Sequence, residues 1–416
     1  MITVKEHCER RGPPVILNGI LSSDTTRLNL SSRRILISAG EASGEMYGAQ
    51  LIEELRRQEP GLEFFGAGGR RMQEAGCETV VDTKELAVVG ITEILGQLPK
   101  IYSLFHKLIG EADRRRPDLA IVIDSPAFNW RVARQMHHRG VPTVYYVCPQ
   151  FWAWRQGRVG LLRKYIRKAL VIFPFEENFY RERGVDATFV GHPLAELQKP
   201  SIDREQYAAK HGLDPQKHWI TIMPGSRRKE VRMNLPTMLE AAGQFGRSFE
   251  FLLPVAPTLE RHFFEELPGG RPVTLVPESL PALWHSRGGI VASGTATVEA
   301  AMMSTPFVMV YRVTGMTYAL GRWRIKVPHL AMVNLIADER VVPELVQADF
   351  TARNVVAEME KIIPEGRERD RMLEGLARVK ARLRAPGDDH GRHPAERAAG
   401  IIFGILGQLK ASGASS

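Results

Sequence analysis

The stretch SAGEASGE, Ser38–Glu45, follows the short apolar run Ile35-Leu36-Ile37 and carries two glycines, Gly40 and Gly44, among small residues. After it, apolar residues recur at helical spacing at Met46, Leu51, Ile52 and Leu55. We therefore predict a tight turn from a strand into a helix. Such a turn can cradle a phosphate, or it can let the backbone bend sharply beside a substrate.

The same order of apolar run and glycine-, proline- or serine-marked turn recurs along the chain. Further runs are LEFFGAGG, LAIVIDSP, TVYYVCPQ, ALVIFPFE, ATFVGHP, WITIMPGSR, FEFLLPVA, VTLVPE, GGIVASGT and PFVMVYR. Continuous apolar strands that alternate with helices predict an α/β fold with parallel sheets covered on both faces. Ligands of open α/β sheets bind at the carboxyl ends of the strands, so the turns are the candidate functional sites.

Length and composition predict a two-domain globular protein. The chain has 416 residues, of which 44% are hydrophobic and 25% charged. No apolar run reaches the ~18 residues of a membrane span, and the N-terminus lacks a signal-peptide core. Three unpaired cysteines suit a reducing cytoplasm, and none has zinc-site spacing. The net charge of +9 favours anionic partners without choosing among nucleic acid, acidic lipid and phosphorylated substrate.

The domain boundaries follow shifts in composition. Residues 1–32 are polar and are predicted to be a disordered extension. A proline-marked polar stretch near 193–203 divides a first domain, 33–195, from a second, 196–350. Residues 351–416 are predicted to be C-terminal helices that pack back on the N-terminal domain.

Two turns of the second domain indicate a nucleotide-diphosphate site. In MPGSRRKEV, the turn Gly225-Ser226-Arg227 offers amides, a hydroxyl and a guanidinium that can bind two phosphate oxygens, and a helix is expected from about Asn234. The alternative for this motif alone is an ordinary turn with solvated basic residues. In ASGTATVEA, Ser293-Gly294-Thr295 precede a helix near Thr297 and make a second anion site. Glu299 is either a helix cap or an acceptor for ribose hydroxyls.

The first domain carries the candidate base. Asp124, in IVIDSPAFNWR, ends an apolar strand and is either a general base at the cleft or a cap of the following turn. Asn129 is either a substrate contact or a surface residue. The aromatic and basic stretch around Trp152 and Trp154 suits nucleic acid, a sugar pocket or interdomain packing. His192 lies at the predicted interdomain position, although a lone histidine is usually structural.

The segment from Leu86 to Asp118 holds more apolar residues than one helix face accommodates. Core packing accounts for about half of the apolar residues in 88–109. The excess, flanked by Lys100, Lys107 and Arg114-Arg115-Arg116, predicts docking on an acidic bilayer surface.

Nine ordered motifs between about Arg34 and Thr351 resemble those of the lipid-A-disaccharide synthase family of bacterial glycosyltransferases. They are AGEASGE, GITEIL, DSPAFN, CPQFWAW, FPFEENFY, FVGHPL, PGSR with a following Glu, ASGTATVEA and NLIADERVVPELVQ. The resemblance implies a GT-B fold, in which two Rossmann-like domains with parallel sheets face a cleft. It also implies lipid A (lipopolysaccharide) biosynthesis, in which UDP-2,3-diacylglucosamine and 2,3-diacylglucosamine 1-phosphate (lipid X) give a β-1,6-linked disaccharide 1-phosphate and UDP.

The resemblance also assigns the site residues. It implies an inverting, metal-independent hexosyltransferase without a cofactor, in which Asp124 is the catalytic base. The nucleotide would contact Gly225, Ser226, Arg227, Ser293, Gly294, Thr295, Thr297, Glu299, Asn334, Glu344 and Gln347. The acceptor side of the cleft would hold Gly40, Glu41, Ser43, Gly44, Asn129, Trp152, Trp154 and His192.

Further expectations concern partners and location. The resemblance implies a cytoplasmic enzyme held peripherally at the inner leaflet of the inner membrane through 88–109. No nucleic-acid partner is expected, because the basic residues are scattered and no RNA-binding motif appears. The resemblance leaves a homodimer open, because family members can pair by exchanging C-terminal segments.

The chain departs from the family pattern at several positions. Glu45 and Ala127 stand where the family often has Asp, and Asp338-Glu339 replace a commoner Gly-Arg, while Cys148 replaces a Ser. The rival predictions are another UDP-sugar GT-B enzyme, such as a cell-wall glycosyltransferase or an epimerase, and a non-catalytic RNA-binding protein.

Overall fold

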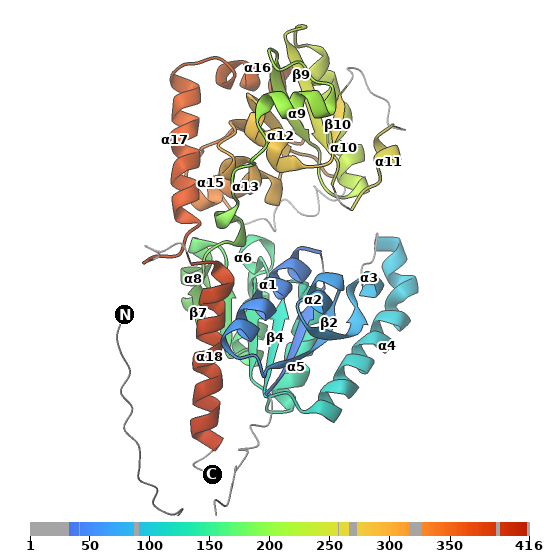
Figure 1. Cartoon of the computed structure of the whole chain (residues 1–416), viewed down its shortest axis with the longest axis vertical. Coiled ribbons are helices and arrows are strands. Elements are labelled where there is room, and N and C mark those ends of the chain that lie inside the picture. Colours follow the sequence, from blue (N-terminus) through green and yellow to red (C-terminus); the bar gives the residue numbers. More distant parts are fainter. Residues whose placement is uncertain are drawn as a thin grey trace, which may run out of the picture. The chain divides into compact units, whose positions relative to one another are not determined.

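The computed structural model describes residues 33–40, 42–86, 91–256, 258–265, 273–315, 327–387 and 392–413. The predicted extension 1–32 and Glu41 therefore lie outside the described residues. Within them, Figure 1 shows two parallel sheets, each with its own helices. We call the seven-stranded sheet with its helices the first lobe and the six-stranded sheet with its helices the second lobe.

The first lobe is built on seven parallel strands in the order β3-β2-β1-β4-β5-β6-β7. The strands are β1 (Arg34–Ala39), β2 (Glu63–Gly68), β3 (Cys77–Asp82), β4 (Leu119–Ile123), β5 (Thr143–Tyr146), β6 (Lys168–Val171) and β7 (Ala187–Phe189). The helices are α1 (Ala42–Gln58), α2 (Arg70–Glu74), α3 (Thr83–Leu86), α4 (Ile91–Arg115), α5 (Pro126–His138), α6 (Phe151–Trp154), α7 (Val159–Tyr165) and α8 (Pro174–Arg181), with 3-10 turns at η1 (Gln156–Arg158) and η2 (Pro193–Glu196).

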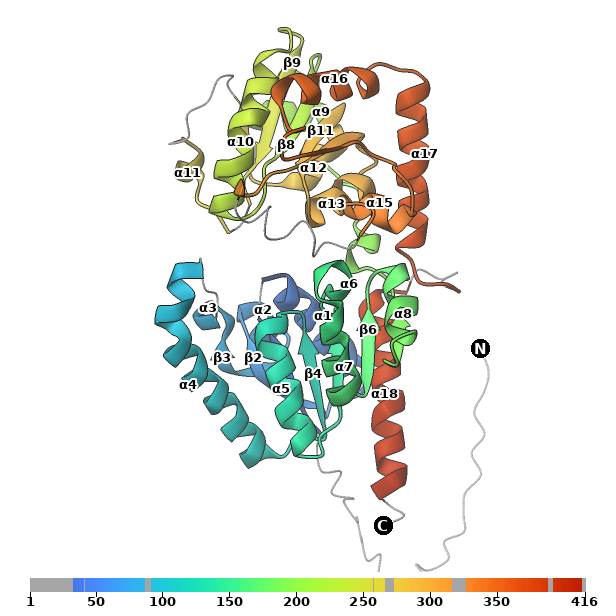
Figure 2. The ribbon, with the colours of Figure 1, turned by 180° about the vertical axis from the view of Figure 1, so that it is seen from behind.

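The sheet of the first lobe is buried on both faces, as its continuous apolar strands predict. In β1, Ile35 and Ile37 belong to the core cluster that includes α1, whereas Leu36 belongs to the cluster with α4 and α5. This alternation follows from the two-residue period of a strand. Figure 2 shows the structure from behind, where α4, α5 and α7 cover the second face of this sheet.

The second lobe repeats this topology with six parallel strands in the order β10-β9-β8-β11-β12-β13. They are β8 (His218–Met223), β9 (Phe249–Pro254), β10 (Thr274–Val276), β11 (Gly288–Ala292), β12 (Phe307–Tyr311) and β13 (Glu344–Val346). Its helices are α9 (Arg204–His211), α10 (Arg228–Gly243), α11 (Arg261–Glu265), α12 (Ser279–His285), α13 (Thr295–Met302) and α15 (Met332–Ala337). Helix α10 begins six residues before the predicted start at Asn234, because the chain enters the helix directly after the turn at Arg227.

Three helices close the chain: α16 (Ala352–Ile362), α17 (Arg367–Arg382) and α18 (Pro394–Gly413). All three were predicted to pack on the N-terminal domain. Helix α18 contacts α1 of the first lobe. Helix α16 instead contacts α10 and β12, and α17 contacts α13 and α15, so both pack on the second lobe. The difference arises because the apolar faces of α16 and α17, with Val355, Met359 and Leu376 fully buried, cover the second sheet's own helices.

In each lobe, the predicted turns lie at the point where the strand order reverses. The order reverses between β1 and β4 in the first sheet and between β8 and β11 in the second. Ligands of doubly wound folds bind outside the carboxyl ends of strands at such a switch point. The turns after β1, β4, β8 and β11 are those that the sequence predicts to be functional.

Candidate active site

The turn after β4 holds Asp124 in an unusual backbone conformation. Asp124 and Ser125 have φ values of 48° and 46°, and Val147, just after the neighbouring β5, has a φ of 56°. Left-handed conformations are uncommon for residues other than glycine, and for a β-branched valine they are exceptional. Strained backbone of this kind gathers at functional sites and persists only where its surroundings hold it.

Hydrogen bonds to neighbouring strands hold this turn. The Asp124 amide donates to the carbonyls of Tyr146 and Val147, at 3.3 Å each. The Tyr145 hydroxyl donates to the Asp124 carbonyl at 2.7 Å. Tyr145 lies in the strand run TVYYVCPQ, and sequence reasoning assigned it no role beyond the core.

Asn129 is a buried clamp between the ends of β1 and β4. Its amide nitrogen donates to the carbonyls of Ser38, Ile123 and Asp124, at 3.1, 2.8 and 2.9 Å. Its amide oxygen accepts a hydrogen bond from the Ser38 hydroxyl at 2.7 Å. Asn129 is fully buried, so it positions the Asp124 turn from behind, and the surface alternative is wrong.

Gly40, directly after β1, makes room for the Asp124 turn. A Cβ built on Gly40 would overlap the Ser125 side chain, and one on Gly44 would lie 3.6 Å from the Ile123 carbonyl. Ser43, beside Gly44 in the first turn of α1, is exposed. The turn after β1 therefore packs directly against Ser125, which explains the glycine at position 40, whereas the space beside Gly44 would admit a Cβ.

Trp152 and His192, predicted on the acceptor side, are both buried, at 5% and 2% exposure. Trp152 donates its indole N–H to the Glu176 carboxylate at 2.8 Å. That carboxylate also accepts the amides of Ile172 and Phe173. Burial raises the pKa of Glu176 to about 7, against these hydrogen bonds. The side chain of Trp154 lies outside what the structure describes.

His192 packs on Phe173, with ring centroids 5.0 Å apart. Its Nδ1 accepts the Leu194 amide at 3.1 Å, and its own amide donates to the Leu383 carbonyl at 2.9 Å. Burial lowers the pKa of His192 to about 3, so the imidazole is neutral. These contacts give His192 a structural role where the chain leaves the first lobe.

In the second lobe, the turn after β8 has an acidic partner. Gly225 has a φ of 124°, in the left-handed region that favours glycine. The Ser226 amide donates to Glu230 Oε2 at 3.2 Å, and Arg227 Nη1 lies 3.3 Å from Glu230 Oε1. The Arg227 side chain is 71% exposed. Sequence reasoning noted this glutamate only as part of the motif.

The turn after β11 combines a glycine, three hydroxyl side chains and a helix N-terminus. Gly294 has a φ of 136°, and a Cβ there would meet no atom within 4 Å. The Ser293 hydroxyl donates to the Leu330 carbonyl at 2.9 Å, and the Thr297 hydroxyl donates to the Gly294 carbonyl at 2.8 Å. Thr295 is exposed at the first position of α13.

Glu299 lies in the second turn of α13 and accepts the Ser279 hydroxyl at 2.8 Å. Burial raises the pKa of this carboxyl, opposed by that hydrogen bond. Ser279 belongs to α12, so this contact supports neither of the two predicted roles, a helix cap and a ribose acceptor, and both stay predictions.

Asn334 and Glu344 form one buried network beside β13. The Asn334 amide nitrogen donates to Glu344 Oε1 at 2.8 Å and to the Val342 carbonyl at 2.9 Å. The Glu344 carboxylate also accepts the amides of Leu330 and Ala331. These contacts fix the backbone directly before α15, so both residues affect the candidate site by positioning the backbone.

Gln347 has a φ of 51° and exchanges hydrogen bonds with the Val313 backbone, at 2.8 and 3.1 Å. It therefore joins the end of β13 to the segment that leaves β12. Like the side chains of Asn334 and Glu344, the Gln347 side chain forms hydrogen bonds within the second lobe.

Tyr47, on α1, is a buried residue whose pKa depends on charges from both lobes. It is 5% exposed, and its pKa is raised to about 12 by burial and then by the negative charges of Asp124 and Glu299. The Tyr146 hydroxyl, whose pKa Tyr47 affects in turn, is buried and has no hydrogen-bond partner among the described residues. Sequence reasoning missed Tyr47 because a tyrosine on an amphipathic helix is typical of a core position.

The residues at which the chain departs from the family pattern have different surroundings in the structure. Glu45 Oε1 accepts the Arg71 amide at 2.8 Å, which joins α1 to α2. Asp338, with a φ of 55°, ends α15, and Glu339 forms an ion pair with Arg378 at 2.7 Å. Cys148 is buried, and Ala127 is exposed in the first turn of α5.

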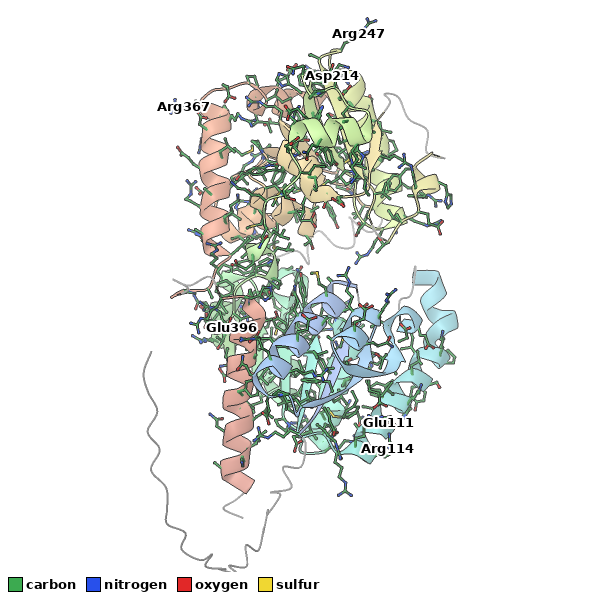
Figure 3. All side chains as sticks on the ribbon, in the orientation of Figure 1. Glu111, Arg114, Asp214, Arg247, Arg367 and Glu396 are labelled. Atoms are coloured by element: carbon green, nitrogen blue, oxygen red, sulfur yellow. The ribbon has the colours of Figure 1, made fainter. Side chains whose placement is uncertain are left out.

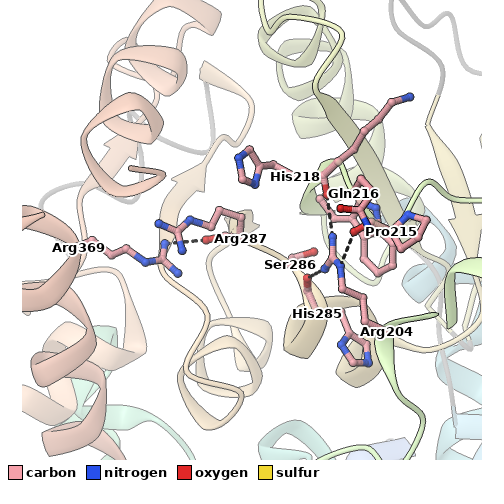
Figure 4. Close-up of a pocket in the computed structure, with 10 residues that line it drawn as sticks. Arg204, Pro215, Gln216, His218, His285, Ser286, Arg287 and Arg369 are labelled. Carbon is pink, nitrogen blue, oxygen red and sulfur yellow. Dashed lines mark hydrogen bonds between the residues drawn. The ribbon is translucent and has the colours of Figure 1, made fainter. Parts of the chain in front are cut away.

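A surface pocket of about 340 Å³ lies away from these turns (Figure 4). It is lined by Arg204, Pro215, Gln216, Lys217, His218, Trp219, His285, Ser286, Arg287 and Arg369. These residues lie at the amino ends of β8 and β11, opposite to the predicted site. Arg204 donates to three backbone carbonyls there and Arg369 to two, so both arginines support the wall of the pocket.

The predicted membrane segment 88–109 is described only in part, since residues 87–90 and the side chains of 91–98 lie outside the described set. Beyond them, Leu104 and Leu108 are buried, whereas Tyr102 is 66% exposed. Arg114 forms an ion pair with Glu111 at 2.6 Å (Figure 3). No described helix is long and apolar enough to cross a membrane.

No group of three or more His, Cys, Asp or Glu side chains that could hold a metal ion occurs among the described residues. The absence of a metal and of a cofactor from the reaction stays a prediction.

Solved structures share the fold over nearly the whole chain. The S. aureus MnaA-UDP co-structure matches with a TM-score of 0.61 at 12% identity, covering 90% of this chain and 97% of that one. CalG4, the calicheamicin glycosyltransferase, matches with a TM-score of 0.56 at 16% identity, covering 91% of this chain and 99% of that one. The two doubly wound sheets thus form a GT-B fold, which confirms the predicted fold class.

Sequence comparison narrows this class. A family model described as lipid-A-disaccharide synthetase matches residues 35–384. A lipid-A-disaccharide synthase of Koribacter versatilis (strain Ellin345) is 50% identical over 377 residues, covering 89% of this chain and 98% of that protein. One of Geobacter sulfurreducens is 40% identical over 384 residues, covering 91% and 98%. The chain belongs to the lipid-A-disaccharide synthase family, and it is a glycosyltransferase of lipid A biosynthesis.

Proposed function

We propose that this glycosyltransferase transfers 2,3-diacylglucosamine from its UDP conjugate to the 6-hydroxyl of 2,3-diacylglucosamine 1-phosphate. The bond between the sugar C1 and the UDP oxygen breaks, and a β-1,6 bond forms to the acceptor oxygen. The products are the disaccharide 1-phosphate and UDP. One in-line displacement inverts the α-linked donor into the β-linked product.

Asp124 is the base of this proposal. It takes the proton of the acceptor hydroxyl as that oxygen attacks C1. The observation that carries the assignment is its strained, left-handed turn at the switch point of the first sheet, beside Tyr47, whose pKa also responds to Glu299 of the second lobe. A base held rigidly by Asn129 and Tyr145 can be pre-oriented toward the acceptor, which supplies part of the rate.

The second lobe supplies the donor site of this proposal. Arg227, the amides of Ser293–Thr295 and the N-terminus of α13 stabilise the negative charge that develops on the leaving UDP. Neither a metal nor a cofactor takes part. The Asn334–Glu344 network and Gln347 act by fixing the loops that carry these groups.

Residues 88–109 provide the membrane contact of this proposal, on the cytoplasmic face of the inner membrane. Tyr102, the exposed aromatic residue on α4, supports it together with the exposed Lys107. Replacing Tyr102 with Ser is expected to reduce co-flotation with anionic vesicles at unchanged thermal stability. Unchanged flotation would count against this contact. A homodimer stays a prediction that the mass in solution would test.

The reaction is tested by following UDP and lipid product together, in the presence of a chelator, for wild type and Asp124→Asn. Asparagine tolerates the left-handed backbone, so this variant removes the base without unsettling the turn. We expect turnover to fall by roughly 10²- to 10⁴-fold, the usual contribution of general-base catalysis, at unchanged UDP affinity. Asp186→Asn, an exposed change in the same lobe, serves as the matched control.

Three results would redirect the proposal. Full activity of Asp124→Asn would move the base elsewhere. Loss of activity with chelator alone would refute metal independence. Wild-type UDP binding without turnover on these two lipids would favour another UDP-sugar enzyme of the same fold.

A further inference from the structure

The carboxylate of Glu230 lies on the turn that the proposed function assigns to the donor's phosphates. Its two oxygens reach the Ser226 amide at 3.2 Å and the Arg227 guanidinium at 3.3 Å. A backbone amide and a guanidinium in one turn are the groups that would bind a phosphate. Glu230 therefore holds the donors that an incoming anion needs.

The turn is shaped to admit this carboxylate. Gly225 has a φ of 124°, and a Cβ built on it would lie 2.7 Å from Glu230 Cβ and from Oε2. A side chain at this position would push Glu230 away from the turn. The Thr258 hydroxyl donates to the Ser226 carbonyl at 2.6 Å and so also holds the backbone of this turn.

The charges of Glu230 and Arg227 also affect the end of strand β12. The pKa of Tyr311, the last residue of β12, is raised by burial and by Glu230 and is lowered by Arg227. The side chain of Glu230 is 38% exposed, so it can leave the turn without uncovering a buried core. The contact is thus a partly solvated ion pair, which a stronger anion can replace.

We propose that Glu230 is an internal anion that occupies the phosphate-binding turn when the site is empty and competes with the diphosphate for it. This inference rests on the proposed function. UDP carries a terminal phosphate, with a second pKa of about 6, and so carries about one more negative charge than the UDP-sugar diester. Repulsion by Glu230 therefore acts more strongly on the product than on the donor and promotes UDP release.

The competing explanation is a purely structural one. Glu230 is the third residue of α10, where a carboxylate commonly caps the helix N-terminus. A cap stabilises the helix but gives no reason for a difference between UDP and UDP-sugar. Glu230→Gln separates the two roles, because glutamine keeps an oxygen that accepts the Ser226 amide and carries no charge.

The experiment measures the inhibition constant of UDP and the KM of the UDP-sugar donor for wild type, Glu230→Gln and Glu240→Gln. Glu240 is exposed on the same helix, about 15 Å further along at 1.5 Å per residue, and controls for net charge. We expect Glu230→Gln to lower the UDP inhibition constant by about fivefold, the size of a partly exposed charge interaction. The donor KM should fall by less, and the difference should shrink at high salt.

The outcomes are distinguishable. Equal changes in the UDP inhibition constant and the donor KM, no change, or weaker UDP binding in Glu230→Gln would overturn the inference while leaving the proposed donor site intact. A wild-type chain that binds no UDP would overturn both. Thermal unfolding of each variant shows whether the helix has been destabilised, and Glu230→Ala, which loses cap and charge together, gives the size of the capping effect.

Discussion

Replacing Gly40 with alanine should damage the Asp124 turn from outside it. The new Cβ would lie closer than 3.0 Å to both Oγ and Cβ of Ser125, a separation that real Cβ atoms essentially never show. Ser125 cannot move aside freely, because its backbone is already left-handed with φ 46° and ψ 60°. Its neighbour Asp124 is tied to β5 through its amide and its carbonyl.

The size of the effect can be worked from these contacts. Overpacking of one methyl group costs about 1–3 kcal/mol. The loss of chain entropy in the unfolded state returns ~0.4–1 kcal/mol on a glycine-to-alanine change. A net destabilisation of roughly 1–2 kcal/mol is therefore expected, together with a larger loss of turnover because Asp124 is displaced.

The decisive measurement is a double-mutant cycle with Ser125→Gly, scored by thermal unfolding and by turnover. Glycine at position 125 removes both atoms that the new methyl group meets, and it accepts a positive φ without strain. The double variant should therefore regain most of the stability and turnover lost by Gly40→Ala, with a coupling energy of about 1–2 kcal/mol. If the double variant is as impaired as Gly40→Ala alone, the packing argument for this turn is wrong.

Two further substitutions test buried polar groups. The neutral His192 takes up a proton only on unfolding, since its folded pKa of about 3 lies below the ordinary 6.5. The stability that it contributes is complete above pH 6.5 and is lost as the pH falls toward 3, amounting to a loss of about 2 kcal/mol at pH 5. His192→Gln should therefore show a smaller fall in melting temperature between pH 7.5 and 5 than wild type, and parallel pH curves would contradict this. Asn334→Ala leaves the amides of Val341 and Val342 without their acceptor and removes one of the donors to Glu344, so about 3 kcal/mol of stability should be lost, measured by chemical unfolding. A loss below ~1 kcal/mol would show that water replaces the amide.

The central strands could be predicted from the sequence, and two edge strands could not. Every apolar run that the sequence predicts as a strand is found in one of the two sheets. The strands β3 (CETVVD) and β13 (ELV) were missed because their apolar runs are only two residues long and are flanked by acidic residues, whereas the edge strands β7 and β10 were predicted. Their pairing depends on β2 and β12, which a local pattern cannot show.

The positions of the turns that form the candidate site could be predicted, but the burial of the side chains around them could not. Gly40, Asp124, Arg227 and Gly294 stand at the ends of the strands where the motifs put them. Burial distinguishes Asn129, Trp152 and His192 from the exposed candidates, because these three side chains are at most 5% exposed and make internal contacts. Such burial arises from contacts distant in sequence, as between His192 and Leu383, and leaves no local trace.

The packing of α18 on α1 ties the first helix of the described chain to the last. During synthesis, the seven strands of the first sheet leave the ribosome before any residue of the second sheet. The helix that covers α1 follows roughly 200 residues after β7, which takes about 10–40 s at ~5–20 residues per second. During that interval, α1 of the nascent first lobe is not covered by α18. A stalled or truncated chain that lacks α18 would therefore leave the face of α1 that packs on this helix exposed to solvent.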